Sequence, residues 1–430
     1  MGPSYPSFQP SYSHEDLVEY LLLTPGELEL TPYNISQSPG LMAKEADKNY
    51  SYRMPSGISW KRSVRLLWLV IGALAASLAG ETGGSAVSGP PVAWNPTAAA
   101  RYLDGRAAWW ESWPPSQRDH HTVCVSCHTI LPYALSRPKL QALLGEAHPP
   151  APETTLLQYI EKRVSLWNEV QPYYSDAQSG PGKSRQSRAT ESVLNALVLA
   201  SHDAQSGILR PITRTAFDAA WALQFQAGEK AGAWDWQVFH LAPWESPESQ
   251  YQGATLMALA LGWAPDRYRN DLKIRAHVKL LRSYLKQEYR AQPLLNRAIV
   301  LWASGRFPGL LSRKQQNALV HDLLTKQRAD GGWNLPSLGT WTRQDHTPEE
   351  TGSDGYATGL VTLALGQARG SCCSSEVARA REWLIQHQDK GKGSWRADSL
   401  NKNRNPTTDV GRFMSDAATG FAVLALDQTH

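Results

Sequence analysis

The sequence predicts an all-α protein built from stacked pairs of helices. Five apolar segments rich in Leu, Ala and small residues recur along the chain, and each follows a polar turn. Longer segments with the apolar period of an amphipathic helix lie between them. Because a single helix pair cannot bury its own apolar face, repeats of this length indicate pairs that stack on one another.

The five apolar segments are the expected buried helices, and four amphipathic segments are their expected partners. The apolar segments are residues 189–200, 251–261, 294–304, 354–365 and 416–426. The amphipathic segments are residues 217–225, 272–289, 315–327 and 377–388.

Three amphipathic segments end in loops that share a Gln followed by a Gly and a Trp. These loops are Gln226 to Trp234, Gln327 to Trp333 and Gln388 to Trp395. Gly permits a tight turn, Gln can bond the orphan backbone groups of a helix end, and Trp can pack across to the next pair. From about Thr155 to the C-terminus, this pattern resembles the squalene–hopene cyclase and protein prenyltransferase repeat family. The resemblance implies an α/α toroid of about six helix pairs, with inner helices around a hydrophobic cavity.

The N-terminal part has the features of an export signal. Residues 1–53 are rich in Ser, Pro and Tyr and lack sustained periodicity. Met54 is followed by a Lys/Arg cluster, a short apolar run and small residues up to Ala79, which is the arrangement of a signal peptide over residues 54–79. We expect Met54 to be the biological start, with cleavage after Ala79 and residues 1–53 as an upstream extension. The alternative is an uncleaved N-terminal membrane anchor, since the apolar run is borderline in length for a span.

Residues 80–96 are expected to form a Gly/Ser/Pro linker, and residues 97–150 a haem-attachment segment. A helix is predicted from Thr97 until the Pro114-Pro115 pair, which cannot continue it. A second helix is predicted around residues 132–144. The repeats then occupy residues 151–430.

The most specific motif of the chain lies between those two helices. It is Cys124-Val125-Ser126-Cys127-His128, a C-x-x-C-H. Two thiols at this spacing on a helical turn can each add to one vinyl group of a haem, and the following His can ligate the iron. The motif resembles the attachment site of c-type cytochromes, which implies covalently bound haem c with Cys124 and Cys127 as anchors and His128 as axial ligand. This attachment takes place outside the cytoplasm, in agreement with the expected signal peptide.

Two other interpretations of the motif remain open. One is a disulfide with a nearby His. The other is a zinc site, in which His120 and His121 would complete the four ligands that a closed site needs. The sixth iron ligand is also open: the candidates are Met257, Met414, His120, His121 and His240. An open sixth position would favour small-ligand chemistry over electron transfer alone.

The catalytic residues of the cyclase and prenyltransferase family are not matched. The chain has no D-x-D-D acid motif, no D-D-x-x-D metal motif and no D-x-C zinc pattern. Three isolated acids, Glu245, Asp354 and Asp416, precede inner helices and could point into the cavity. Helix capping is the simpler expectation for Asp354 and Asp416. The stretch 232–246, with three Trp, a Phe and a His, could line a pocket for a flat or isoprenoid ligand.

Composition limits the classes of function. The net charge is +4 with 19% charged residues and no long basic run, which excludes a nucleic-acid surface. Four Cys are too few for a disulfide-stapled fold. We therefore expect an exported monohaem protein, periplasmic or secreted, with a redox or electron-transfer role. Its expected partner is a redox protein or an apolar, isoprenoid-like molecule. The alternatives are a cyclase-like enzyme without the acid motif and a non-catalytic binding toroid.

Overall fold

The computed structural model describes residues 93–175, 180–368 and 373–427. These residues belong to one compact unit, Gly84–His430. The expected signal peptide and the extension before it lie outside the described residues, as does Cys372.

The described residues are almost entirely helical, which confirms the all-α prediction. The α-helices are α2 (Pro96–Ser112), α3 (Ile130–Leu144), α4 (Ala151–Ser165), α5 (Gly180–Ser206), α6 (Pro211–Ala222), α7 (Ser249–Trp263), α8 (Arg275–Glu288), α9 (Leu294–Arg306), α10 (Arg313–Leu324), α11 (Gly355–Gly366), α12 (Ser374–His387) and α13 (Phe413–Leu426). Short 3₁₀ turns are η1 (Pro114–Ser116), η2 (Asp119–His121), η3 (Tyr268–Asn270), η4 (Leu272–Ile274), η5 (Tyr289–Ala291), η6 (Leu335–Leu338) and η7 (Val410–Arg412). The strands β1 (Gln117–Arg118) and β2 (Thr122–Val123) form one antiparallel pair.

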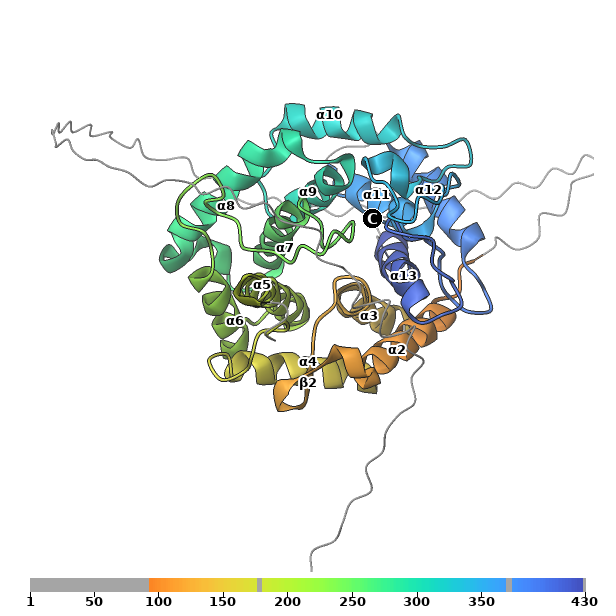
Figure 1. Ribbon diagram of the computed structural model, residues 1–430. Helices are drawn as coiled ribbons and strands as arrows, with labels where there is room; N and C mark the ends of the chain where they lie inside the picture. Colours follow the sequence, from red (N-terminus) through yellow and green to blue (C-terminus); the bar gives the residue numbers. More distant parts are fainter. Residues whose placement is uncertain (1–92, 176–179, 369–372, 428–430) are drawn as a thin grey trace, which may run out of the picture. The chain divides into compact units, whose positions relative to one another are not determined.

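Odd-numbered and even-numbered helices play different parts. Each of α3, α5, α7, α9 and α11 contacts the next odd-numbered helix, and α13 contacts α3, so these six contacts form a closed cycle. Figure 1 shows the even-numbered helices outside this inner set. Each inner helix also contacts a neighbouring outer helix. Residues 97–150 therefore supply one inner and one outer helix of the same arrangement.

Burial distinguishes the two sets as their sequences predict. In α7 every residue from Tyr251 to Leu261 is buried, so this helix is enclosed on all sides. In α8 the buried residues are Val278, Leu281, Tyr284 and Leu285, which share one face. All five apolar segments predicted from the sequence are inner helices, and α3 is the sixth.

A Gln at the end of α10 joins two outer helices. Gln327 Nε2 donates to the Gly331 carbonyl at 2.9 Å in its own loop and to the Glu376 carbonyl at 2.9 Å in the first turn of α12. Trp333 Nε1 donates to the Leu323 carbonyl at 2.8 Å, which fixes the loop on the helix it leaves. The predicted scaffold role of this loop is thus confirmed.

The same arrangement follows α6, but with a different Gln from the one predicted. Gln224, not Gln226, donates to the carbonyls of Gly232 and His277, both at 3.1 Å. Gln226 is exposed. The prediction for Gln226 is wrong because this loop is longer than the other two, and the buried position falls two residues earlier than sequence spacing suggests.

After α12 the arrangement connects the end of the described chain to its beginning. Gln388 Nε2 donates to the carbonyls of Gly393 and Asn95, both at 3.0 Å, and Asn95 N donates back to Gln388 Oε1 at 2.6 Å. Asn95 is the N-cap of α2. Gly393 has φ +85°, and a Cβ there would lie 2.1 Å from the Ala98 carbonyl oxygen, so only Gly permits this approach.

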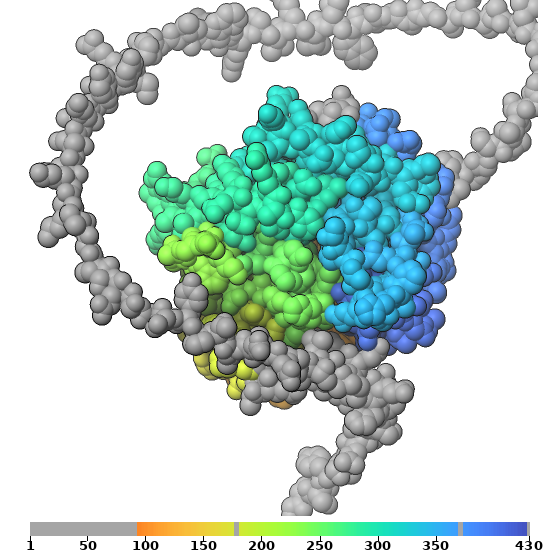
Figure 2. Space-filling model, turned by 45° about the horizontal axis from the view of Figure 1, so that its top comes forward, coloured from red at the N-terminus to blue at the C-terminus, as the bar shows by residue number. Residues whose placement is uncertain are grey.

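The connections from outer to inner helices meet on one face. Ala242, in the loop after α6, exchanges two hydrogen bonds with Asn401, in the loop after α12, both at 2.8 Å. Gln344, in the loop after α10, donates to the His240 carbonyl at 3.1 Å. Figure 2 shows segments around residues 240 and 340 meeting on this face. The loop with the C-x-x-C-H motif is also an outer-to-inner connection.

Within the described residues, we find no helix that combines the length and apolar character needed to cross a membrane.

Candidate functional site

The Cys–His motif occupies the connection between α2 and α3. Strands β1 and β2 pair just before it, and Cys124 N donates to the Ser116 carbonyl at 3.0 Å. Cys124 to Ser126 have no regular secondary structure, and residues 127–129 form the turn that enters α3. The predicted helical turn is therefore wrong for Cys124, because the hairpin bonding continues through its backbone.

Ser126, between the two cysteines, organises the start of α3. Its Oγ accepts from the backbone N–H groups of Thr129 at 3.3 Å and Ile130 at 3.1 Å. These are orphan donors of a helix N-terminus, which a Ser oxygen satisfies well. The residue between the cysteines thus sets the direction in which Cys127 and His128 leave the turn.

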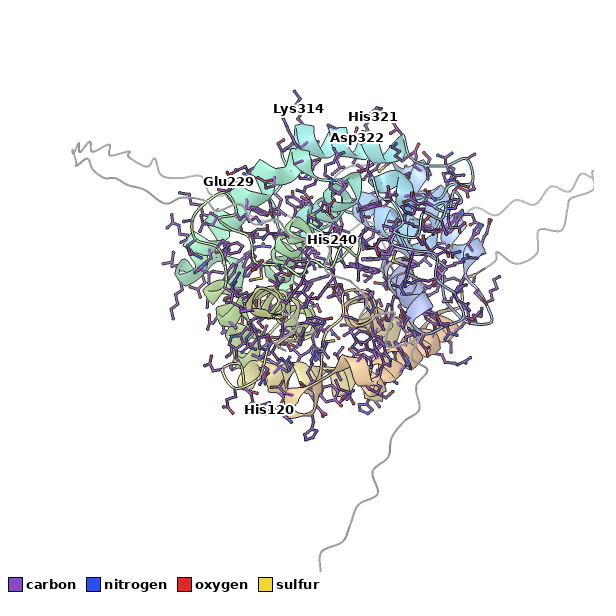
Figure 3. The ribbon with its side chains drawn as sticks, viewed as in Figure 1. His120, Glu229, His240, Lys314, His321 and Asp322 are labelled. Atoms are coloured by element: carbon purple, nitrogen blue, oxygen red, sulfur yellow. The ribbon has the colours of Figure 1, made fainter. Side chains whose placement is uncertain are left out.

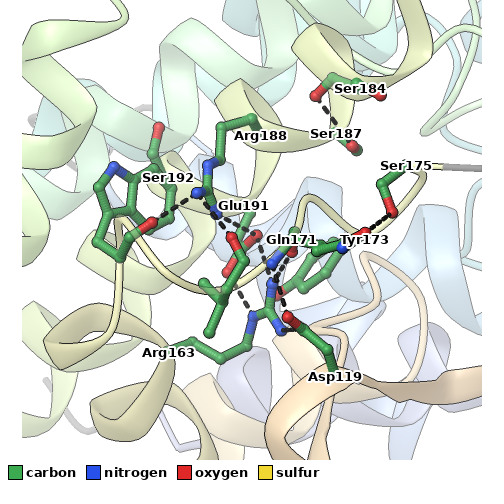
Figure 4. A network of polar contacts seen from close by, with 12 residues as sticks. Asp119, Arg163, Gln171, Tyr173, Ser175, Ser184, Ser187, Arg188, Glu191 and Ser192 are labelled. Atoms are coloured by element: carbon green, nitrogen blue, oxygen red, sulfur yellow. Dashed lines mark hydrogen bonds and ion pairs between the residues drawn. The ribbon is translucent and has the colours of Figure 1, made fainter. Parts of the chain in front are cut away.

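A buried ion pair holds the hairpin before the motif (Figure 4). The Arg163 side chain is 1% exposed and donates to Glu191 Oε1 at 2.5 Å, to Asp119 Oδ1 at 3.0 Å and to Thr122 Oγ1 at 2.9 Å. Tyr173 OH accepts from Val125 N at 3.1 Å within the motif. Helices α4 and α5 thereby fix the approach to Cys124, which sequence analysis missed because these residues are distant in the chain.

Both cysteines of the motif are free thiols. The disulfide interpretation is therefore not the state seen here. Cys124 is buried and Cys127 half-buried. Burial raises the pKa of both thiols above the ordinary value, so both carry their proton at neutral pH.

His128 lies among aromatic rings. Its imidazole stacks on Phe413 with 3.8 Å between ring centroids and an interplanar angle of 25°. Trp110 lies edge-on at 5.1 Å and Trp244 is tilted at 5.6 Å. Burial, with a smaller contribution from nearby Arg106, lowers the pKa of His128 to about 3. The imidazole is therefore neutral at physiological pH, which is the form that binds a metal.

The Nδ1 atom of His128 is engaged by its neighbour. It lies 2.9 Å from Thr129 Oγ1, and Thr129 in turn donates to Asp416 Oδ2 at 2.7 Å. Tyr102 OH and Arg106 Nε donate to Asp416 Oδ1 at 2.7 and 2.8 Å. A chain of hydrogen bonds thus runs from His128 to a fully buried carboxyl group.

The expected capping role holds for Asp354 but not for Asp416. Asp354 is the N-cap of α11 and accepts from Ala357 N at 2.8 Å; burial raises its pKa to about 7. Asp416 lies inside the first turn of α13, and side chains of α2 and Thr129 occupy its oxygens. Burial raises the pKa of Asp416, and the Arg106 guanidinium opposes this effect. The capping prediction for Asp416 is wrong because a cationic partner from a distant helix competes for the carboxyl group.

An apolar pocket lies beside Cys127. Its lining includes Leu135 of α3, Trp302 of α9, Phe421 of α13, and Trp236 and Trp244 of the loop after α6. The cavity volume is about 20 Å³, enough for about one water molecule.

The aromatic stretch 232–246 is divided between two roles. Trp236 and Trp244 line the pocket. Trp234 instead donates from Nε1 to the Ala220 carbonyl at 2.6 Å, as part of the loop that follows α6. Glu245 follows Trp244, and burial raises its pKa to about 7, opposed by the charge of Lys183.

The candidates for a sixth ligand are scattered. Met257 and Met414 are buried in α7 and α13. His120, His121 and His240 are exposed, and Figure 3 places His120 at the outer edge of the unit and His240 among the loops. Within residues 93–175, 180–368 and 373–427, no group of three or more His, Cys, Asp or Glu side chains could hold a metal ion.

Comparisons with known proteins do not assign a family. No family model matches the sequence, and no characterised protein matches it at a significant level. A solved structure described as a glycosidase variant matches at 9% identity and a TM-score of 0.43, covering 77% of this chain and 97% of its own. A likeness this weak carries no information about the activity of this chain.

Proposed function

We propose that the protein is an exported monohaem c-type protein with a redox or electron-transfer role, built on an α/α toroid. The observation that supports this proposal best is the donor set in the connection between α2 and α3. Two free thiols and a neutral imidazole stand within five residues, next to an apolar pocket.

The residues fit a covalently held haem in their chemistry. The S–H groups of Cys124 and Cys127 would each add across one vinyl double bond, so that sulfur and hydrogen are both retained in a thioether. His128 Nε2 would bind the iron, because Nδ1 is engaged by Thr129. The bound group would supply one-electron redox chemistry, and Trp236, Trp244 and Phe421 would exclude water around it.

The toroid proposal rests on contacts and on the resemblance of the repeats. The inner helices form a closed cycle of contacts, and three Gln–Trp loops join successive outer helices. These are the features that the squalene–hopene cyclase and prenyltransferase resemblance implies.

Haem binding requires movement of side chains over the pocket. The free space of about 20 Å³ is far below the size of a porphyrin. The half-buried Trp244, which lines the pocket and lies against His128, is the ring best placed to move.

Covalent attachment is tested in a host competent for cytochrome maturation. The purified full chain should give a pyridine haemochrome spectrum, and the haem should stay with the protein in acidified acetone. Cys127→Ser should weaken this retention. Cys373→Ser, which replaces a buried cysteine outside the motif, should leave retention unchanged. A colourless preparation with both motif thiols free to titrate would contradict the proposal.

The apolar pocket supports a second candidate, a cyclase-like or binding toroid for an isoprenoid-like molecule. Three Trp line the pocket, and Glu245 nearby would retain its proton up to a pH of about 7. Organic extraction of the exported protein distinguishes the two proposals: an isoprenoid in the extract without haem favours this candidate. Elemental analysis of the same sample tests the zinc interpretation.

A further inference from the structure

We infer that Thr129 and Asp416 are positioning residues for His128. Their hydrogen bonds hold its neutral imidazole in the tautomer that carries the proton on Nδ1 and keeps the lone pair on Nε2. The use of that lone pair for iron rests on the proposed function. The tautomer itself is a property of the chain without haem.

The first step is the hydroxyl group of Thr129, which has one hydrogen to donate. It donates this hydrogen to Asp416 Oδ2 at 2.7 Å. At its second contact, 2.9 Å from His128 Nδ1, Oγ1 must therefore accept. A hydrogen bond at this contact requires the imidazole proton on Nδ1.

The second step is the carboxyl group of Asp416, which acts as the acceptor at the end of this chain. Tyr102 and Arg106 both donate to its other oxygen, at 2.7 and 2.8 Å, and its side chain is 0% exposed. Arg106 is itself fixed by Asp409, whose Oδ1 and carbonyl each accept from it at 2.7 Å. These contacts keep Asp416 Oδ2 in place as the acceptor for Thr129.

The third step is the common origin of two contacts on His128. Phe413 and Asp416 are three residues apart on α13, so they lie on the same face of that helix. Phe413 stacks on the imidazole face at 3.8 Å, and Asp416 acts on its Nδ1 edge through Thr129. Helix α13 therefore restricts the imidazole in two ways: Phe413 fixes the plane of the ring, and Asp416, through Thr129, fixes the position of Nδ1. A metal-ligating His commonly has its other ring nitrogen fixed by such a second partner.

The tautomer is measured in the full chain prepared without haem. Histidine labelled with ¹⁵N gives separate side-chain resonances for protonated and unprotonated ring nitrogens, and His128→Gln identifies the His128 pair by their loss. We expect the wild-type protein to show a protonated Nδ1 and an unprotonated Nε2. Thr129→Val, which keeps the shape but removes the hydroxyl, should shift the proton toward Nε2. Thr129→Ser should restore the wild-type resonances.

Three results would overturn the inference: a protonated Nε2 in the wild-type protein, wild-type resonances in Thr129→Val, or failure of Thr129→Ser to restore the wild-type resonances.

A second readout uses the haem-loaded protein. Removing the hydrogen bond at Nδ1 makes the imidazole a weaker electron donor, so the reduction potential of Thr129→Val should rise and that of Thr129→Ser should not; an unchanged potential in Thr129→Val would count against the role toward iron. If the wild-type tautomer is as expected and no haem is attached, the positioning of His128 stands and only the proposed function fails.

Discussion

At the scale of single residues, the site separates into a part that is local in sequence and a part that is not. Cys124, Cys127 and His128 could be selected from the sequence because their spacing alone defines the motif. Asp416 could not, since 310 residues separate it from Arg106, the partner that changes its role. The local sequence predicts a helix cap at Asp416. Only the fold shows that the Arg106 guanidinium and the hydroxyl groups of Tyr102 and Thr129 donate to its carboxyl group.

Replacing Asp416 should destabilise the protein strongly. Asp416→Asn removes the charge that balances buried Arg106, which keeps only the half-exposed Asp409. Losing one partner of a buried pair typically costs about 3 kcal/mol. Urea unfolding of the full chain measures this loss. Asp398→Asn, which affects a surface pair with Arg396, should change the free energy of unfolding by less than about 0.5 kcal/mol.

Glu245 should make stability fall as the pH rises. Its pKa is about 7 in the folded protein and 4.5 as the ordinary value, so between these values the unfolded chain releases a proton that the folded protein retains. The folded state then binds more protons, and the free energy of unfolding decreases with increasing pH across this window. Glu245→Gln should show a smaller decrease, because Asp354, whose pKa burial also raises to about 7, still contributes in the same window. Unfolding curves from pH 4 to 8, with the exposed Glu229→Gln in parallel, test this; identical profiles for wild type and Glu245→Gln would contradict it.

At the scale of helices, the apolar pattern predicted the inner helices correctly, whereas the loop pattern selected the wrong Gln after α6. Segments such as 251–261 are buried on every side, and a continuous apolar run signals this directly. The loop after α6 was harder, because its extra residues separate Gln224 from Trp234. Sequence spacing favoured Gln226 as the residue that joins the two helices. Gln224 has this role instead, because it is buried in contact with α8.

The two neighbouring glutamines provide a matched test of this correction. Gln224→Ala removes hydrogen bonds to Gly232 and His277 inside the protein, and should cost about 1 to 3 kcal/mol. Gln226→Ala changes an exposed side chain and should cost less than about 0.5 kcal/mol. Equal losses in thermal or urea unfolding would mean that the loop does not join α6 to α8 as described.

At the scale of the whole molecule, the sequence predicted about six helix pairs, and the described residues contain them. It indicated that the segment 97–150 is built into this scaffold, but not which of its two helices is the inner one. The contacts of α3 with α13 and α5 show that α3 is the inner helix.

Export predicts a defined mature N-terminus. If Met54 starts the protein and cleavage follows Ala79, intact-mass analysis of the exported chain should find Gly80 as the first residue. Replacing Ala79 with Arg should block processing, because signal cleavage requires a small residue there. A peptide from residues 1–53 in the exported protein would contradict this assignment.

Two hydrogen bonds between Gln388 and Asn95 join the loop after α12 to the start of α2, so this contact does not depend on where the chain begins and ends. A circular permutant could join residue 427 to residue 93 through a linker of roughly ten residues, enough to run beside α12, whose 14 residues span about 21 Å. New ends could open in the exposed turn near Gly309 without breaking either hydrogen bond at the old seam. In such a permutant the first and last helices would become ordinary interior neighbours.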